Sequence, residues 1–208
     1  MCKHYLVAKR LRLMKKVFTV ILILAWCGAF AQDSLKSFNY SRHQITTTGM
    51  EVLGSWAIAN IGVGAVGWAN SAGGSNKYFY QMDVLWNLVN LGAAIQGFTG
   101  AKKNESNLFT PAESLKEQQK IEKIFLINGG LDVVYIGAGL FLKHRGDIEN
   151  SDQLQGYGSS IILQGAFLLL FDGTMYNAQR HNGGKIKRFL EKNPVTFDGR
   201  RVGMIYNM

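Results

Sequence analysis

The sequence has few of the residues that carry redox or thiol chemistry. Only two cysteines occur among 208 residues, and both, Cys2 and Cys27, lie in the first 31 positions. A chain cleaved after residue 31 therefore contains no cysteine, which excludes disulfides, thiol catalysis and cysteine-based metal sites. Proline occurs twice, and charged residues make up 18% of the chain. A charge-poor chain with 24 glycines and long apolar runs indicates a membrane protein.

Catalytic motifs are missing as well. Neither His-Glu-x-x-His nor Gly-x-Ser-x-Gly occurs. Residues Gly62–Gly67 spell Gly-x-Gly-x-x-Gly, but they lie inside an apolar segment with no strand before it, so the context of a nucleotide loop is absent. His43, His144 and His181 lie outside the apolar segments or at their ends, which argues against a haem held between helices. We therefore predict no enzyme activity, no metal site and no cofactor.

The first 31 residues have the composition of a secretory signal peptide. They contain six Lys and Arg residues and no acid. Lys15 and Lys16 precede the apolar run Val17–Phe30, and Ala29–Ala31 supplies an Ala-x-Ala cleavage site. Without this segment the chain retains 17 basic and 14 acidic residues, so most of its net charge of +9 belongs to the predicted signal. We predict no nucleic-acid partner, because the basic excess is not on the remaining chain.

Four long, weakly charged segments follow a polar stretch, residues 32–49, which we interpret as an exported lead. Each segment has about 20 residues, which is the length of helix that crosses the hydrocarbon core of a bilayer. Only helices satisfy their backbone groups within one segment there. The sequence predicts an all-α fold, a four-helix transmembrane bundle within residues 50–182. Its spans are Met50–Asn70, Tyr80–Gly100, Ile124–Leu142 and Tyr157–Asn177.

The connections and the tail carry local signals. Residues 71–77 predict a tight Gly/Ser turn, and Thr110–Glu113 predicts a capping box with proline at the first helical position. That helix is expected to run from Pro111 to about Lys143. Gly183 and Gly184 predict a helix stop. The remaining tail, residues 183–208, is basic; we expect either an interfacial amphipathic helix or a solvated one at 185–192, and a hairpin over 195–206.

Several polar side chains lie within the predicted spans. Counting residues from the span ends places five of them within about one helical turn of the middle of the bilayer. They are Asn60, Asn87, Asn90, Asp132 and Gln164, with Asp83 and Asp172 flanking them nearer the surfaces. An aspartate at the centre of a span costs about 2.5–3.5 kcal/mol on insertion scales, so we expect Asp132 to face the bundle interior or water. Two interpretations stay open: hydrogen bonding that packs the helices, or a polar cavity for a small solute or a proton.

Five stretches of the chain resemble an uncharacterised family, a domain of unknown function found in small multi-pass membrane proteins of Bacteroidota-type bacteria. They are Tyr78–Met82, Trp86–Leu91, Ile121–Ile124, Leu131–Val133 and Leu163–Phe167. The likeness covers roughly residues 50–180. It implies a helical membrane protein and supplies no activity.

Together these features predict a multi-pass protein of the bacterial cell membrane. Its expected partners are the lipid bilayer and a second copy of the chain or another membrane protein. The leading interpretation is a structural or partner-binding role, and the alternative is transport of a small solute or proton around Asp132. A cleaved signal places residue 32 outside the cytoplasm, whereas the distribution of Lys and Arg favours the reverse, so the orientation stays open.

Overall fold

The computed structural model describes residues 2–192, 195–197 and 202–204, with side chains for 34–188, 190 and 191. The elements in order are the helices α1 (Cys2–Asn70), α2 (Gly74–Glu105), α3 (Pro111–Glu149) and α4 (Asp152–Lys192), and the strands β1 (Val195–Phe197) and β2 (Val202–Met204). The chain divides into two compact units, residues 1–38 and residues 39–208.

The first unit, residues 1–38, is the beginning of α1, which is helical from Cys2. The predicted signal peptide covers most of this unit and stays a prediction. The stretch 32–49, which we interpreted as an exported lead, is helical throughout, and its later residues belong to the second unit.

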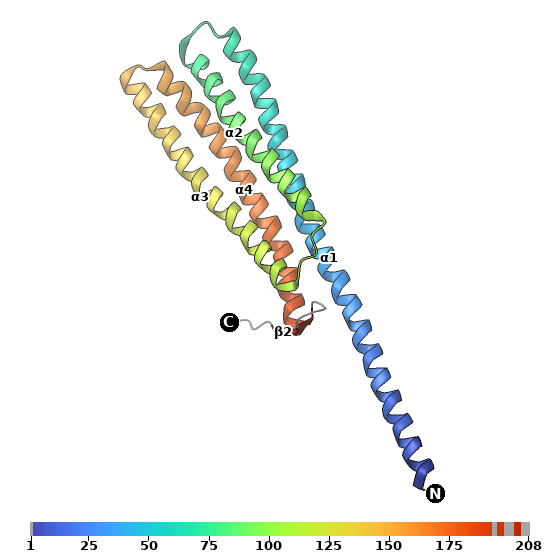
Figure 1. Cartoon of the computed structure of the whole chain (residues 1–208). Coiled ribbons are helices and arrows are strands. Elements are labelled where there is room, and N and C mark those ends of the chain that lie inside the picture. The colour runs from blue at the N-terminus through green and yellow to red at the C-terminus, as the bar shows by residue number, and fades with distance from the viewer. Residues whose placement is uncertain (1, 193–194, 198–201, 205–208) are drawn as a thin grey trace. The chain divides into compact units, whose positions relative to one another are not determined.

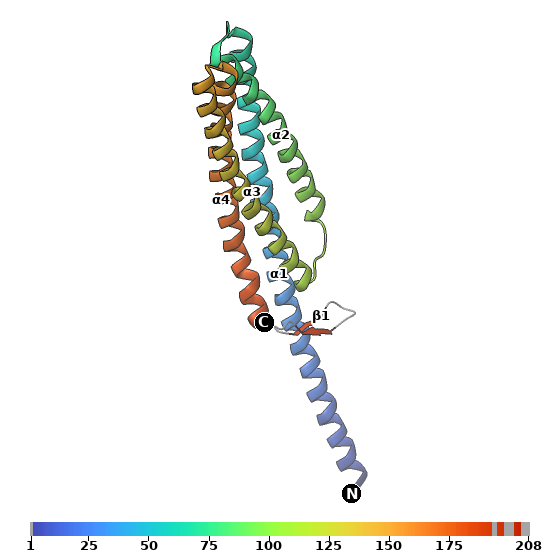
Figure 2. The same cartoon turned by 90° about the vertical axis from the view of Figure 1, so that its left-hand side faces the viewer.

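The second unit is the predicted four-helix bundle. From Asn39 onward α1, α2, α3 and α4 run alternately up and down (Figures 1 and 2). The Gly/Ser turn joins α1 to α2 but is shorter than predicted, because α2 begins at Gly74 and residues 74–77 are helical; Gly73 and Gly74 are both at positive φ. α4 packs against both α2 and α3. Polar side chains on different faces of α4 can therefore meet different helices, α2 on one side and α3 on the other.

The start of α3 follows the sequence prediction. The Thr110 hydroxyl accepts a hydrogen bond from the backbone N–H of Glu113, and the Glu113 carboxylate accepts one from the backbone N–H of Thr110. This capping box, with Pro111 in the first turn, satisfies donors that the helix leaves unpaired. The helix continues beyond Lys143 and ends at Glu149, where Asn150 adopts the left-handed conformation.

The buried side of α3 repeats every seven residues. It includes Gln118, Phe125, Asp132, Gly139 and Gly146 in turn. This repeat keeps one face of α3 against α4 along its length. The two helices approach most closely through glycine: a Cβ atom on Gly139 would lie 2.8 Å from the backbone oxygen of Gly158. Small residues at such contacts let helices approach without side chains between them.

The predicted helix stop at Gly183 and Gly184 is wrong, because α4 continues to Lys192. The buried stripe of α4 passes these glycines in register: Gln179, Asn182 and Ile186 are all buried. Gly183 is a contact point rather than an end, since a Cβ there would collide with the Glu122 side chain of α3. A glycine within a continuous buried stripe thus marks close helix packing.

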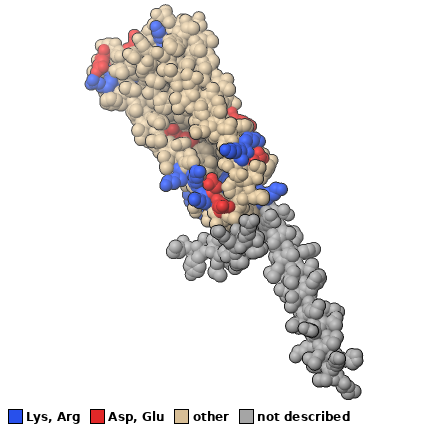
Figure 3. All heavy atoms as spheres, in the orientation of Figure 1, with Lys and Arg blue, Asp and Glu red and all other residues tan. Residues whose placement is uncertain are grey.

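Charge is distributed in bands along the second unit. Between Lys123 and Lys143 of α3 the only ionisable acid or base is Asp132, and this interval spans about 30 Å at 1.5 Å per residue. That length matches the hydrocarbon core of a bilayer, about 30 Å. We call the level of the bundle between Lys123 and Lys143 of α3 the uncharged band. Figure 3 shows the same pattern on one face, with charged side chains collected towards the two ends of the bundle and one small acidic spot between them.

Three helices are long and apolar enough to cross a membrane among the residues that the structure describes: α1 from Ser34, α3, and α4 as far as Arg188. α2 was predicted as a span and does not meet this criterion by composition. Its middle carries Asp83, Asn87 and Asn90, and all three are buried in the bundle.

The tail contains the expected hairpin. β1 and β2 pair antiparallel, with Val195 opposite Met204 and Phe197 opposite Val202. The predicted turn at Asp198 and Gly199 lies outside the described residues.

Candidate functional site

Three acids lie inside the uncharged band, one on each of three helices. They are Asp83 on α2, Asp132 on α3 and Asp172 on α4, and their exposed fractions are 2%, 2% and 5%. A carboxyl group buried at this depth requires hydrogen bonds, a counter-ion or water. The three acids meet this requirement in different ways.

Asp83 lies in a hydrogen-bonded network that joins three helices. The Gln164 side-chain amide of α4 donates to Asp83 Oδ1 at 2.5 Å, and the Asn87 amide donates to the same oxygen at 3.3 Å. Trp56 Nε1 of α1 donates to Gln164 Oε1 at 3.0 Å, and its indole stacks on Phe167 with ring centroids 3.8 Å apart. The side chains of Asn87 and Gln164 are fully buried. We call these four polar residues, Trp56, Asp83, Asn87 and Gln164, the sealed network.

Asp132 and Asp172 form the second arrangement, which we call the acid pair. Their carboxyl groups lie within hydrogen-bonding reach of each other, and the Asn128 side chain reaches Asp172. Asp132 Oδ2 is buried and has no hydrogen-bond partner. In contrast to Asp83, this carboxyl group does not receive enough donors from the bundle.

A cavity of about 750 Å³ lies beside the acid pair. Asp132, Asp172, Asn128 and Asn90 line one end of it, and Arg42, His43, Glu117 and Lys120 line the other. Between these ends the walls are apolar and come from all four helices, including Met50, Leu53, Ala93, Ile124, Phe125, Leu168 and Phe171. From Lys120 to Asp132 along α3 the cavity covers about 18 Å. It therefore connects the charged end of the bundle to the middle of the uncharged band.

An aromatic contact lies near each end of the cavity. At the deep end the rings of Trp86 and Tyr135 meet edge to face, with centroids 5.0 Å apart. At the other end the connection from α2 to α3 places Phe109 in the wall, where the Arg42 guanidinium lies 4.9 Å from its ring centroid. Val89 of α2 and Leu131 of α3 line the cavity and are themselves exposed, so the cavity is open between these two helices.

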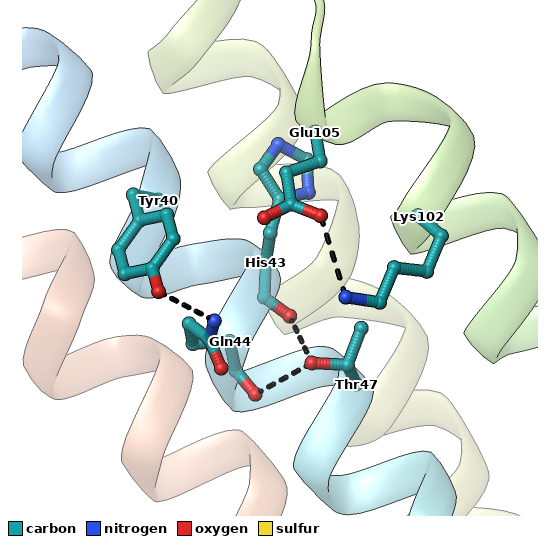
Figure 4. Close-up of polar contacts among 6 residues, drawn as sticks. All are labelled: Tyr40, His43, Gln44, Thr47, Lys102 and Glu105. Carbon is teal, nitrogen blue, oxygen red and sulfur yellow. Dashed lines mark hydrogen bonds and ion pairs between the residues drawn. The ribbon is translucent and has the colours of Figure 1, made fainter.

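The charged end of the cavity contains a second buried polar atom without a partner. His43 is 7% exposed, lines the cavity, and its Nε2 makes no hydrogen bond. Figure 4 shows the imidazole beside Glu105, which forms an ion pair with Lys102 at 3.5 Å. The backbone around His43 is held by Thr47, whose hydroxyl donates to the carbonyl oxygens of His43 and Gln44. The imidazole therefore retains hydrogen-bonding capacity at Nε2.

The structure places the seven predicted polar residues in two groups and leaves one apart. Asn87 and Gln164 join Asp83 in the sealed network, while Asp132 joins Asp172. Asn90 connects the groups, because its amide donates to Asn87 Oδ1 at 3.3 Å and its side chain lines the cavity. Asn60 stands apart: its amide donates to the backbone oxygen of Trp56 on its own helix.

Sequence reasoning missed a polar layer between the helices beyond the uncharged band. Gln118 of α3 donates to the backbone oxygen of Gln179 on α4 at 2.6 Å, and Gln179 donates to the hydroxyl of Thr46 on α1 at 3.0 Å. Ser114 accepts from Asn39 and, through its carbonyl oxygen, from Arg42. The signal was present, because Gln118 occupies the same seven-residue repeat as Phe125 and Asp132.

The described residues contain no evident metal site. No group of three or more His, Cys, Asp or Glu side chains there is arranged to hold a metal ion. The acid pair offers two carboxyl groups, with amides of Asn90 and Asn128 on the same wall of the cavity.

The fold and the site define a class: a four-helix bundle with helices of membrane-spanning length and an internal cavity that reaches a buried carboxyl pair. Residues 52–173 match a family of unknown function, DUF6992. The match covers more than half of the chain, so this protein belongs to that family, in agreement with the resemblance seen in the sequence. It includes the sealed network and the acid pair and begins after Arg42 and His43. No curated protein and no solved structure matches the chain.

Proposed function

We propose that this chain is a multi-pass protein of the bacterial cell membrane that admits a small solute from one face of the bilayer to the acid pair at its middle. The observation that carries the proposal is the cavity, which runs from Arg42 and His43 to Asp132 and Asp172. Packing alone accounts for the sealed network, where the polar groups satisfy each other. It does not account for the buried, unpartnered Oδ2 of Asp132, a residue that lines the cavity.

The proposal includes the properties predicted from sequence. The chain acts without enzyme activity, metal or cofactor, and its environment is the lipid bilayer. α2 crosses with the other helices because its polar side chains face inward, which is the arrangement that polar groups adopt in membrane bundles. A bundle of four helices encloses little space, so we expect translocation to involve a second copy.

Thiol accessibility tests this proposal. Cys2 and Cys27 are the only cysteines, so replacing both with serine gives a background without reactive thiols. Asn128→Cys then places a thiol on the cavity wall, while Ile127→Cys places one at the same depth on a side chain that is 51% exposed and does not line the cavity. In reconstituted vesicles we expect a water-soluble methanethiosulfonate to label Asn128→Cys and to leave Ile127→Cys unlabelled. Absence of labelling at both positions contradicts the proposal.

A second candidate function is the structural or partner-binding role that leads the sequence interpretation. The observation that favours it is Leu108, whose side chain is 90% exposed in the connection between α2 and α3, outside the uncharged band. In that role Leu108 would contribute to a contact with another protein. Leu108→Ser should reduce cross-linking to such a partner and leave thiol labelling in the cavity unchanged.

A further inference from the structure

The apolar segments of the four helices hold no basic residue that could pair with the acid pair. Between Glu51 and Lys77, between Lys77 and Lys102, between Lys123 and Lys143, and between Asp152 and Arg180, the chain contains no Lys, Arg or His. Most buried acids in membrane proteins pair with a basic side chain or with hydrogen-bond donors. Here the groups beside the acid pair are Asn128 and each other, and Asp132 Oδ2 remains without a partner. The acid pair therefore either carries negative charge, which a positively charged ligand can neutralise, or holds protons, which such a ligand can displace.

The walls determine what kind of cation fits. The acid pair has only two carboxyl groups, and no group of three or more His, Cys, Asp or Glu side chains in the described residues could hold a metal ion. Next to the acid pair the cavity is lined by aromatic and aliphatic side chains, Phe125, Leu131, Tyr135, Leu168 and Phe171. Its volume, about 750 Å³, lies in the range of sites that bind small organic molecules. Aromatic rings also attract organic cations through their faces.

From this combination we infer that the cavity binds a lipophilic organic cation, whose charged group lies at Asp132 and Asp172 and whose apolar body lies against Phe125, Leu168 and Phe171. The inference rests on the proposed function and names its solute class. An organic anion is excluded by the acid pair, and a strongly hydrated ion is disfavoured by the apolar middle of the cavity. The Arg42 end carries one net positive charge, because Arg42 and Lys120 line it with only one acid, Glu117; it lies about 18 Å along α3 from the acid pair, which sets the charge preference where the cation binds.

Two ions of matched size and opposite charge test the inference. Tetraphenylphosphonium and tetraphenylborate present nearly the same apolar surface, so a difference in their binding reports the sign of charge that the site prefers. In titrations of the full chain in detergent, we expect the phosphonium ion to bind at least about tenfold more tightly than the borate. Equal binding of the two ions overturns the inference.

Three variants locate the binding. Asp132→Asn and Asp172→Asn preserve shape and hydrogen-bonding capacity, and each should weaken phosphonium binding at least about tenfold. Asp83→Asn is the matched control, since it removes a buried acid of the same band that does not line the cavity; its affinity should equal that of the wild type. Thermal unfolding of each variant shows whether it folds. Undiminished binding by folded Asp132→Asn and Asp172→Asn overturns the inference.

A protection experiment separates this inference from the proposed function. Bound phosphonium should slow thiol labelling of Asn128→Cys in the cysteine-free background, whereas the borate should not. If Asn128→Cys is labelled and the phosphonium neither binds nor protects, the inference fails and the solute pathway stands. If Asn128→Cys is not labelled at all, the proposed function itself fails.

Discussion

The sealed network and the acid pair lie in the same bundle and satisfy buried carboxyl groups to different degrees. Asp83 receives two side-chain donors, from Gln164 and Asn87, and does not line the cavity beside the acid pair. Asp132 has an oxygen with no partner and lies on the wall of a cavity. The comparison shows that burial alone does not indicate a binding role. The number of partners left for an outside group is what distinguishes the two sites.

The difference arises from α4, which packs between α2 and α3. Gln164 and Asp172 are eight residues apart on α4, so they point about 80° apart around its axis at 100° per residue. Gln164 meets Asp83 of α2, and Asp172 meets Asp132 of α3. The first contact offers an amide to a carboxylate, and the second brings two carboxyl groups together. α4 therefore supplies the hydrogen-bond donor that the sealed network needs, but it supplies a second acid and no donor to the acid pair.

Replacing Asp83 should produce the largest loss of stability. Asp83→Leu removes the acceptor for the Gln164 amide and leaves that group buried without it, at about 1–3 kcal/mol. The Asn87 amide keeps its hydrogen bond to the Asp83 backbone oxygen at 2.8 Å. Asp83→Asn retains an acceptor oxygen and should lose much less. Unfolding of both variants in mixed detergent micelles measures the difference. If Asp83→Leu is as stable as Asp83→Asn, the network is not sealed as described.

Two neighbouring alanines on α2 allow a comparison of a closely packed position with a position that faces the cavity. Ala94 is buried, and its Cβ lies 3.6 Å from the Cβ position of Gly54 on α1, while Ala93 lines the cavity. Ala94→Leu should lower the free energy of unfolding by about 1–3 kcal/mol through overpacking. Ala93→Leu should change it by less than about 0.5 kcal/mol and instead weaken binding of tetraphenylphosphonium. Equal destabilisation by both would mean that the cavity is not open in the folded protein.

The tryptophan of the sealed network should have a smaller effect. Trp56→Phe removes the donor to Gln164 Oε1 and retains an aromatic ring to stack on Phe167. The expected loss is about 1 kcal/mol, the net worth of one hydrogen bond. A cycle with Gln164→Leu checks the assignment, because the cost of Trp56→Phe should shrink when Gln164 is already absent. Additive losses would show that the two side chains do not interact.

Much of the fold was predictable from local sequence. Segment length located the helices within residues 50–182, the Thr110–Glu113 capping box located the start of α3, and Gly73 located the first turn. These signals are local, since each depends on a few consecutive residues and on the backbone. The α4 end was mispredicted for the same reason. Gly183 has the local appearance of a stop, and only its contact with Glu122 of α3 explains why the helix passes through it.

Counting residues from the ends of the predicted spans did not predict which polar side chains pair with each other. That count places Asp132 level with Gln164, yet the two side chains belong to different sites, because their helices face different neighbours. The layer around Gln118 and Gln179 was missed because polar residues beyond the apolar segments have the composition of solvated ones. Partners across a bundle depend on the rotation and order of helices, which one sequence does not specify.

The smallest change in stability is expected at Asp132, and it is the sharpest test of the comparison. Asp132→Leu removes a buried carboxyl group that has an unpartnered oxygen, and it relieves the contact of two acids with each other. Because its neighbour is another acid and not a basic side chain, removing Asp132 breaks no ion pair, which is the case in which loss of a buried charge is strongly destabilising. We therefore expect unfolding free energies of the wild type, Asp132→Asn and Asp132→Leu to agree within about 1 kcal/mol, unlike those of the Asp83 series. Both Asp132 variants should nevertheless lose phosphonium binding, because each lacks the charge. A loss of stability in Asp132→Leu as large as that in Asp83→Leu would instead show that Asp132 serves packing, and the two sites would then have the same role.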